Sequence, residues 1–361
     1  MSNRIFLRVR SITQQTTEAV SITFDKPENT HFEYKAGQFL TFIIQKDGQE
    51  IRRAYSLCSS PNTDEFPAVA IKKVQNGNIS QYMTTQVKVG DTLECLTPMG
   101  IFTTDFAVDN QRHLVLFAGG SGITPMFSIL KTALSIEKNT KVSLIYANKD
   151  NENIIFKTEL EHLEKQYADR FKIITVLEKA PFFWSKGYKG YLDTSKIKKI
   201  LESLPKTNIR DTEFMMCGPQ PMMKVIENSF KELSLPLDKL KKENFSLSPE
   251  ESAEGKVKNS TITTENNNNK EGFEIKVKYD GEEHTFKVPP QKTILEVALS
   301  LNIDLPFSCQ SGMCTACLGR CVAGKVHLDE EDALTPKELA QGIILTCVGH
   351  PVSEGVIIEI D

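Results

Sequence analysis

The sequence has no long apolar run and almost no excess of charge of either sign. None of its stretches approaches the roughly 18 consecutive apolar residues of a membrane-spanning helix. Its 43 Lys and Arg residues nearly balance 47 Asp and Glu residues, for a formal charge of −4. Because nucleic-acid binding requires clustered cations, we expect a protein that binds neither membranes nor nucleic acids.

The N-terminus lacks the continuous apolar segment of a signal peptide, since residues 1–10 alternate apolar with basic side chains. Five of the eight cysteines lie within the last 53 residues. A secreted disulfide scaffold would be shorter and richer in cysteine, so we expect a cytoplasmic protein whose cysteine cluster binds metal or performs redox chemistry. A chain of 361 residues predicts two or three domains.

The residue pattern changes three times along the chain. Residues 1–107 contain short alternating runs separated by turns, which predicts a small antiparallel β-barrel or sandwich. In residues 108–247, apolar runs alternate with helical patterns, as in an α/β domain with a parallel sheet. Residues 248–271 are polar and favour a flexible linker. Residues 272–361 begin with a hairpin and a short helix, which predicts a separate α+β domain.

Four cysteines in the last domain follow the spacing C-x4-C-x2-C-x29-C. They are Cys309, Cys314, Cys317 and Cys347. Three thiolates on one tight loop and a fourth farther along the chain can hold a [2Fe–2S] cluster, and this is the plant-type ferredoxin spacing. The alternatives are a zinc site or unrelated buried cysteines, but zinc sites usually pair two C-x2-C units and only one is present. Cys321 falls outside the pattern and is expected to be a packed thiol.

A glycine-rich turn follows the apolar run 114–118. Glycines let the backbone approach a pyrophosphate, and the following helix offers its N-terminal amides. The G-x-G-x-x-G fingerprint is absent, so a plain turn is the alternative. A second strand of the same sheet ends in a Cys-Gly-Pro segment, whose cysteine could be a core residue. The candidate residues are Gly119, Gly120, Gly122, Thr124, Pro125, Cys217, Gly218 and Pro219.

Three residues of the β region could contact a flat, phosphorylated cofactor: Arg53, Tyr55 and Ser56. Arginine binds phosphate in a bidentate manner, a tyrosine ring can stack on a heterocycle, and a serine hydroxyl can bond a ring nitrogen. Residues 53 and 55 share one face of a strand, with 54 and 56 on the other. An exposed strand edge is the alternative.

In chain order these motifs resemble the ferredoxin–NADP reductase superfamily, and the cysteine loop resembles plant-type ferredoxins. The order of the domains is similar to that of oxygenase reductase components, the phenylacetyl-CoA epoxidase type among them. The resemblance implies a flavin-binding antiparallel β-barrel, an α/β nicotinamide-nucleotide domain and an α+β domain of the β-grasp type.

The resemblance also implies the roles of individual residues. It assigns FAD, with FMN as the alternative, to Arg53, Tyr55 and Ser56, and it assigns the flavin pyrophosphate to Gly77, Ile79 and Ser80, where an ordinary hairpin turn is the alternative. Ser56 and Cys217 would be the catalytic residues beside the reacting atoms. Lys149 and Lys179 favour NADPH as the electron donor, whereas Glu178 favours NADH.

The function implied is electron transfer from NADPH (or NADH) through FAD and the cluster to a partner oxygenase, by a chain expected to be a monomer. A reductase serving a flavodoxin or a haem protein, and a redox sensor, are the alternatives. Residues 270–361 hold eight basic and fifteen acidic side chains. The acidic block 329–332 is therefore either a docking face for a basic partner or a solvated loop.

Overall fold

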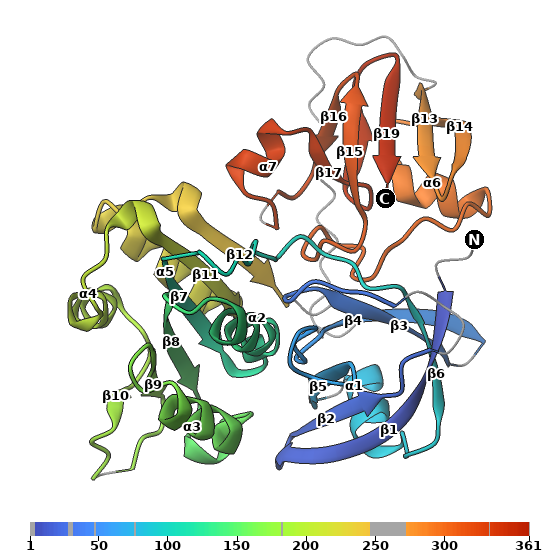
Figure 1. Cartoon of the computed structure of the whole chain (residues 1–361). Coiled ribbons are helices and arrows are strands. Elements are labelled where there is room, and N and C mark those ends of the chain that lie inside the picture. The colour runs from blue at the N-terminus through green and yellow to red at the C-terminus, as the bar shows by residue number, and fades with distance from the viewer. Residues whose placement is uncertain are drawn as a thin grey trace. The chain divides into compact units, whose positions relative to one another are not determined.

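The computed structural model describes residues 4–27, 32–46, 48–75, 77–181, 183–245, 272–331 and 333–360. The chain forms two compact units. Of the described residues, one unit contains those within 5–44 and 55–245, and the other contains Arg4 and those within 45–54 and 272–360. Figure 1 shows the sheets and helices that make up each part of the chain. The predicted linker, residues 248–271, lies outside the described residues.

The N-terminal region forms a six-stranded sheet in the order β4-β3-β6-β1-β2-β5. Its pairs are antiparallel, as between β1 and β2 and between β2 and β5. Along β1, Ile5, Leu7 and Val9 are buried between exposed neighbours, so one face of the strand enters the core. The strands are β1 (Arg4–Thr16), β2 (Ala19–Phe24), β3 (Phe39–Lys46), β4 (Gln49–Ser56), β5 (Ala68–Lys72) and β6 (Thr92–Leu96).

A helix, α1 (Asn78–Thr85), lies between β5 and β6. The predicted β region therefore also contains a short helix, where the sequence favoured a loop or turn. Only Ile79, Ser80 and Met83 are buried in α1. Because the helix is short and mostly polar, its period is hard to distinguish from that of a turn.

The middle of the chain forms a six-stranded parallel sheet in the order β10-β9-β8-β7-β11-β12. The predicted parallel architecture is confirmed. The chain first moves outward from β7 through β8, β9 and β10, and then returns to the other side of β7 with β11. The elements are β7 (His113–Gly119), α2 (Ile123–Ile136), β8 (Lys141–Asn148), α3 (Lys157–Gln166), β9 (Phe171–Leu177), β10 (Gly187–Lys189), α4 (Thr194–Ser203), β11 (Thr212–Gly218), α5 (Gln220–Glu232) and β12 (Leu240–Asn244).

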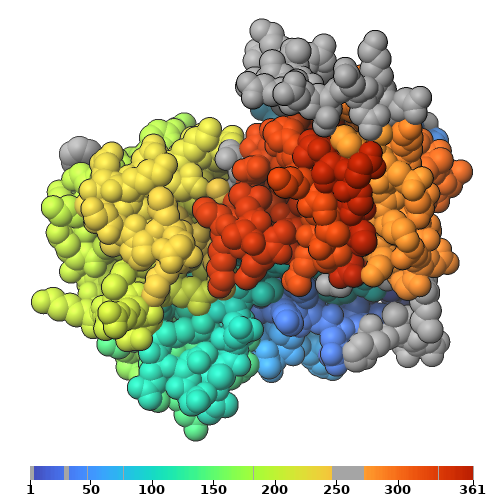
Figure 2. All heavy atoms as spheres, turned by 90° about the horizontal axis from the view of Figure 1, so that it is seen from above, coloured from blue at the N-terminus to red at the C-terminus, as the bar shows by residue number. Residues whose placement is uncertain are grey.

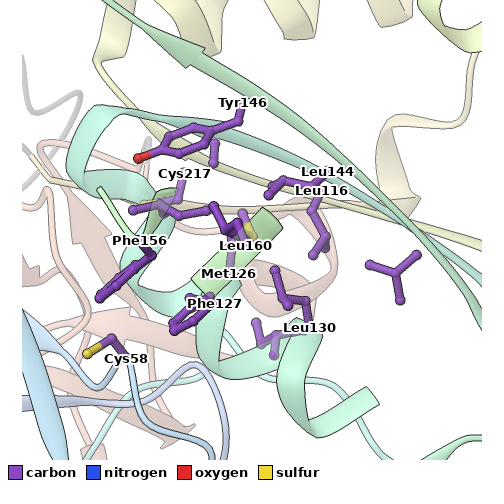
Figure 3. Packing of buried hydrophobic residues seen from close by; sticks show 14 of the residues in the cluster. Cys58, Leu116, Met126, Phe127, Leu130, Leu144, Tyr146, Phe156, Leu160 and Cys217 are labelled. Carbon is purple, nitrogen blue, oxygen red and sulfur yellow. The ribbon is translucent and has the colours of Figure 1, made fainter. Parts of the chain in front are cut away.

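Helices cover both faces of this sheet, each over its own apolar core. One core gathers residues of α2 and α3 with alternate residues of the strands, and it includes Tyr146 and Cys217 (Figure 3). The other gathers residues of α4 and α5, such as Ile197 and Phe230. The strands are consequently buried on both faces, which explains their unbroken apolar runs.

The C-terminal region forms a five-stranded sheet in the order β14-β13-β19-β15-β17. The first and last strands, β13 and β19, run parallel, and β13 and β14 form the expected hairpin. Thr293 and Glu296 make a capping box at the start of α6, which is the expected short helix. The elements are β13 (Phe273–Tyr279), β14 (Glu282–Val288), α6 (Ile294–Ser300), β15 (Leu318–Ala323), β16 (Val326–Leu328), α7 (Pro336–Ala340), β17 (Ile343–Leu345), β18 (Gly349–Pro351) and β19 (Val356–Ile360).

Among the described residues, no helix has the length and apolar character needed to cross a bilayer.

Candidate active site and iron–sulfur site

The two glycine-containing strand ends meet at the point where the parallel sheet reverses its strand order. Strands β7 and β11 are neighbours, and they end at Gly119 and Gly218. A Cβ atom at Gly122 would lie 2.2 Å from the backbone oxygen of Cys217, so only glycine fits there. Ligands of open α/β sheets bind outside the carboxyl ends of strands at such a reversal. The predicted nucleotide residues therefore gather where a nucleotide crevice is expected.

The turn between β7 and α2 is held by hydrogen bonds that leave the start of the helix open. The Thr124 hydroxyl donates to the carbonyl of Ser121 at 3.0 Å, and the buried Tyr146 hydroxyl donates to the carbonyl of Gly120 at 3.1 Å. Within the described residues, no side chain caps the N-terminus of α2. Its first backbone amides are thus available to an anionic group such as a pyrophosphate.

Ser56, at the end of β4, donates a hydrogen bond to a carboxyl group that the sequence analysis missed. The Ser56 hydroxyl lies 3.1 Å from Oε2 of Glu243 on β12. Glu243 stands opposite Cys217 in the pairing of β12 with β11. The structure therefore brings the two predicted catalytic residues, Ser56 and Cys217, to the same acidic side chain.

Burial sets the protonation of this group of side chains. It raises the pKa of Glu243 to about 8, while the hydrogen bond from Ser56 lowers it. Burial and the nearby Glu243 raise the pKa of the Cys217 thiol well above its usual value. Near neutral pH the thiol is protonated and Glu243 can carry a proton. The group can therefore hold a proton next to the carboxyl ends of β11 and β12.

The remaining flavin candidates lie on β4 and at the start of α1. The centre of the Tyr55 ring lies 6.1 Å from the centre of the Phe42 ring, and Tyr55 is partly exposed. The Ser80 hydroxyl accepts from the amide of Val74 and donates to the carbonyl of Gly77, so it shapes the loop. Among the described residues, no side chain caps α1 at Gly77. The open amides of this helix fit the phosphate tail of a flavin.

The four cysteines of the predicted cluster come together in the C-terminal region. The sulfurs of Cys317 and Cys347 lie 3.2 Å apart. The thiol of Cys309 is hydrogen-bonded to those of Cys314 and Cys347, and these bonds hold its pKa well below the usual range. Backbone amides of residues 311, 312 and 314 also point at the sulfurs of Cys309 or Cys347, at 3.4–3.5 Å.

Four neighbouring cysteine sulfurs are the donor set of a two-iron cluster, in which each iron takes two of them. The amides that point at the sulfurs would stabilise their negative charge.

The carboxyl ends of β8 and β9 carry the residues that bear on the choice of nicotinamide nucleotide. The amide of Lys179 donates to the carbonyl of Lys149 at 2.7 Å, so the backbones of the two lysines are adjacent just beyond the ends of β9 and β8. The carboxylate of Glu178 is hydrogen-bonded to the Tyr191 hydroxyl, which raises the pKa of that tyrosine. Two lysines and a carboxylate that is hydrogen-bonded to a tyrosine thus lie at this edge of the sheet.

Three family models match the chain in the order that the motifs suggest. They are an oxidoreductase FAD-binding domain over residues 7–104, an oxidoreductase NAD-binding domain over residues 116–228 and a 2Fe-2S iron–sulfur cluster binding domain over residues 277–352.

Curated relatives match the chain along nearly its whole length. The ferredoxin reductase component of 3-ketosteroid-9-alpha-monooxygenase from Rhodococcus rhodochrous is 32% identical over 99% of this chain and 97% of its own. One component of 1,2-phenylacetyl-CoA epoxidase from Escherichia coli is 31% identical over 98% of this chain and 97% of its own. Phthalate dioxygenase reductase has the same fold, with a TM-score of 0.58 and 22% identity over 99% of this chain and 98% of its own.

The fold and the site define an oxidoreductase with domains for FAD, a nicotinamide nucleotide and a [2Fe–2S] cluster. The chain belongs to the family of ferredoxin–NADP reductase-type flavoproteins with a C-terminal [2Fe–2S] domain, which includes the reductase components of oxygenases.

Proposed function

We propose that this chain is the reductase component of an oxygenase system and passes electrons from NADPH to a separate oxygenase. The observation that carries the proposal is the meeting of the two glycine turns with Ser56 and Glu243 in a chain that also holds the four-cysteine loop. When bound, FAD accepts two electrons together and releases them one at a time to the cluster, which suits a one-electron acceptor protein.

The residues of the chain have distinct roles in this proposal. The amides at the starts of α1 and α2 bind the pyrophosphates of FAD and of the nicotinamide nucleotide. Tyr55 and Arg53 orient the flavin from β4. Ser56 and Cys217 are the catalytic residues beside the reacting ring atoms, and Glu243 fixes the Ser56 hydroxyl by accepting its hydrogen bond at 3.1 Å. The four cysteines hold the cluster.

We infer NADPH as the preferred donor because the lysines at positions 149 and 179 are adjacent at the carboxyl edge of the sheet. Their cations can meet a 2′-phosphate, whereas Glu178 is engaged by Tyr191. Replacing both lysines by alanine should raise the KM for NADPH about tenfold or more and leave the KM for NADH nearly unchanged. An equal rise for both nucleotides would contradict this assignment.

The partner we propose is an oxygenase of the phenylacetyl-CoA epoxidase type. The test is reconstitution of the purified reductase with the oxygenase components of such an epoxidase, with formation of the epoxide measured against consumption of NADPH. We expect the two to rise together. If the electrons instead reach only a flavodoxin or a haem protein, the partner has been assigned to the wrong class.

We place the docking face for this partner at the acidic segment beside the cysteine loop. A Cβ atom at Gly312 would lie 2.8 Å from Cβ of Glu330, so the segment packs directly on the loop. Figure 2 draws the atoms of the C-terminal region in orange to red. Asp332, the last residue of the acidic block, lies outside the described residues.

Charge reversal tests this docking face. The double variant Glu330→Lys/Glu331→Lys should slow electron delivery to the oxygenase at low salt, and high salt should remove the difference. Glu354→Lys, an exposed position elsewhere in the same unit, is the control. Equal rates for the acidic-segment variant and the wild type at low salt would dismiss docking there.

We also infer a monomer that binds neither membranes nor nucleic acids and works in the cytoplasm. Its balanced overall charge supports the absence of nucleic-acid binding. Light scattering of the purified chain is the test, and a dimer mass would contradict the proposed monomer.

A further inference from the structure

A buried arginine connects strand β4 to the segment that leads into the cysteine loop. Both belong to the same compact unit, which contains residues 45–54 and the C-terminal region. The Arg52 side chain is only 2% exposed. Its Nε donates to Oε1 of Glu50 at 2.8 Å, its Nη2 donates to Oδ1 of Asp304 at 2.5 Å, and its guanidinium stacks 4.1 Å from the centre of the Phe307 ring.

A second arginine completes a network of four charges. Arg4 donates from Nη1 to Oε2 of Glu50 at 3.1 Å and from Nη2 to Oδ2 of Asp304 at 3.0 Å. Each carboxylate is therefore shared by two guanidinium groups. Burial tends to raise the pKa of Glu50 and of Asp304, but the hydrogen bonds from Arg52 and Arg4 outweigh it and lower both. Arg52 is buried, whereas the side chains of Glu50 and Asp304 are 28% and 50% exposed. Loss of a carboxylate leaves the buried Arg52 without one partner, and loss of Arg52 breaks both ion pairs, so the contact depends strongly on Arg52.

A hydrogen bond from a backbone amide to a serine hydroxyl reinforces this contact. The amide of Ala54 donates to Oγ of Ser308 at 3.0 Å. Strand β4 stands at the end of its sheet, so it has backbone groups that no neighbouring strand uses. Ala54 immediately precedes Tyr55 and Ser56, and Ser308 immediately precedes Cys309. The contact thus joins Ala54 of β4 to the residue that precedes the first cluster cysteine.

We propose that Arg52 is a positioning residue that holds the cysteine loop on β4 and thereby sets the path of electron transfer from FAD to the cluster. The inference rests on the proposed function. Each transfer moves one electron from reduced FAD to the oxidised cluster and forms no bond between them. The flavin releases its protons to solvent as its electrons leave.

The test uses the full-length protein with FAD and cluster bound. Arg52→Gln and Asp304→Asn remove one partner each, and their combination removes both. Phe307→Leu keeps every charge and removes only the stacking, so it serves if the charge variants do not fold. Lys276→Gln is the matched control, because Lys276 makes an exposed ion pair with Glu283 in the same unit.

Two measurements separate positioning from catalysis. Hydrogen exchange measures how well the Ala54 amide is protected by its hydrogen bond. Anaerobic stopped-flow absorption follows reduction of the flavin by NADPH and then reduction of the cluster. For Arg52→Gln we expect the exchange of the Ala54 amide to rise about tenfold or more. We also expect reduction of the cluster to slow by about tenfold or more, with an unchanged rate of flavin reduction. The double variant should reduce its cluster no more slowly than the slower of the two single variants, since the two residues act as one contact.

The experiment distinguishes a failure of the positioning role of Arg52 from a failure of the proposed function. If the variants at positions 52 and 304 match Lys276→Gln in exchange and in cluster reduction, the positioning role of Arg52 is overturned. If NADPH reduces neither the flavin nor the cluster of the wild-type protein, the proposed function itself fails. An unchanged absorption spectrum of the bound cluster in Arg52→Gln is expected, because the four cysteine ligands remain; loss of that spectrum would mean that Arg52 maintains the cluster and does not merely position it.

Discussion

Replacement of Glu243 by glutamine should change the pH dependence of stability in a defined direction. Burial raises the pKa of Glu243 from 4.5 to about 8. Within that pH window the unfolded chain releases a proton that the folded protein keeps, so wild-type stability decreases as the pH rises. At about 1.4 kcal/mol per pKa unit, the full shift corresponds to at most ~5 kcal/mol. Because Glu243 is partly exposed, solvent screening reduces this contribution, and we expect about half of it.

The assay is denaturant unfolding of the wild type and of Glu243→Gln at about pH 5 and about pH 9. Glutamine keeps an oxygen that can accept the hydrogen bond of Ser56 but has no proton to lose. The stability of the variant relative to the wild type should therefore increase by about 2 kcal/mol between the two pH values. Glu232→Gln, at an exposed position, should follow the wild type at both. A difference between Glu243→Gln and wild type that does not change with pH would refute the reasoning.

Three further predictions concern other parts of the molecule. Gly122→Ala should destabilise the protein by about 1–3 kcal/mol and raise the KM for NADPH, because the new Cβ meets the Cys217 backbone; an unchanged KM would contradict the proposed nucleotide site. Burial lowers the pKa of His113 to about 4, so wild-type stability should fall by up to ~3 kcal/mol as the pH drops from about 6.5 to about 4, and an unfolding series should show a shallower fall for His113→Gln. Cys347→Ser should abolish the visible absorption of the cluster while flavin absorption remains, and retention of the cluster bands would contradict the assigned ligand set.

The segments predicted correctly from the sequence are those in which one residue pattern dominates. The apolar runs of β7, β8 and β11 are buried on both sides, so their sequences differ sharply from the helices between them. The glycine turns and the cysteine spacing are local patterns with a direct chemical reason. The structure brings the residues of each pattern together: the two turns meet in the parallel sheet, and the four sulfurs meet in the C-terminal region.

The residues that the sequence analysis missed owe their roles to distant parts of the chain. Glu243 lies in the run Lys241-Lys242-Glu243-Asn244, which has the composition of a solvated surface, and only the pairing of β12 with β11 brings it to Ser56. The one available signal was the position of that run after the last helix of the α/β domain, where a further strand could end. Arg52 likewise has no local signature, because its carboxylate partner Asp304 is 252 residues away.

Anaerobic titration of the purified protein with NADPH, followed by visible absorption, tests the proposed electron route most directly. We predict that the flavin and iron–sulfur bands both bleach, after about three electrons per chain. NADPH should reduce the protein faster than NADH does. If the flavin bleaches while the protein has no iron–sulfur band, the four cysteines serve another purpose, and the electron route to an oxygenase is contradicted.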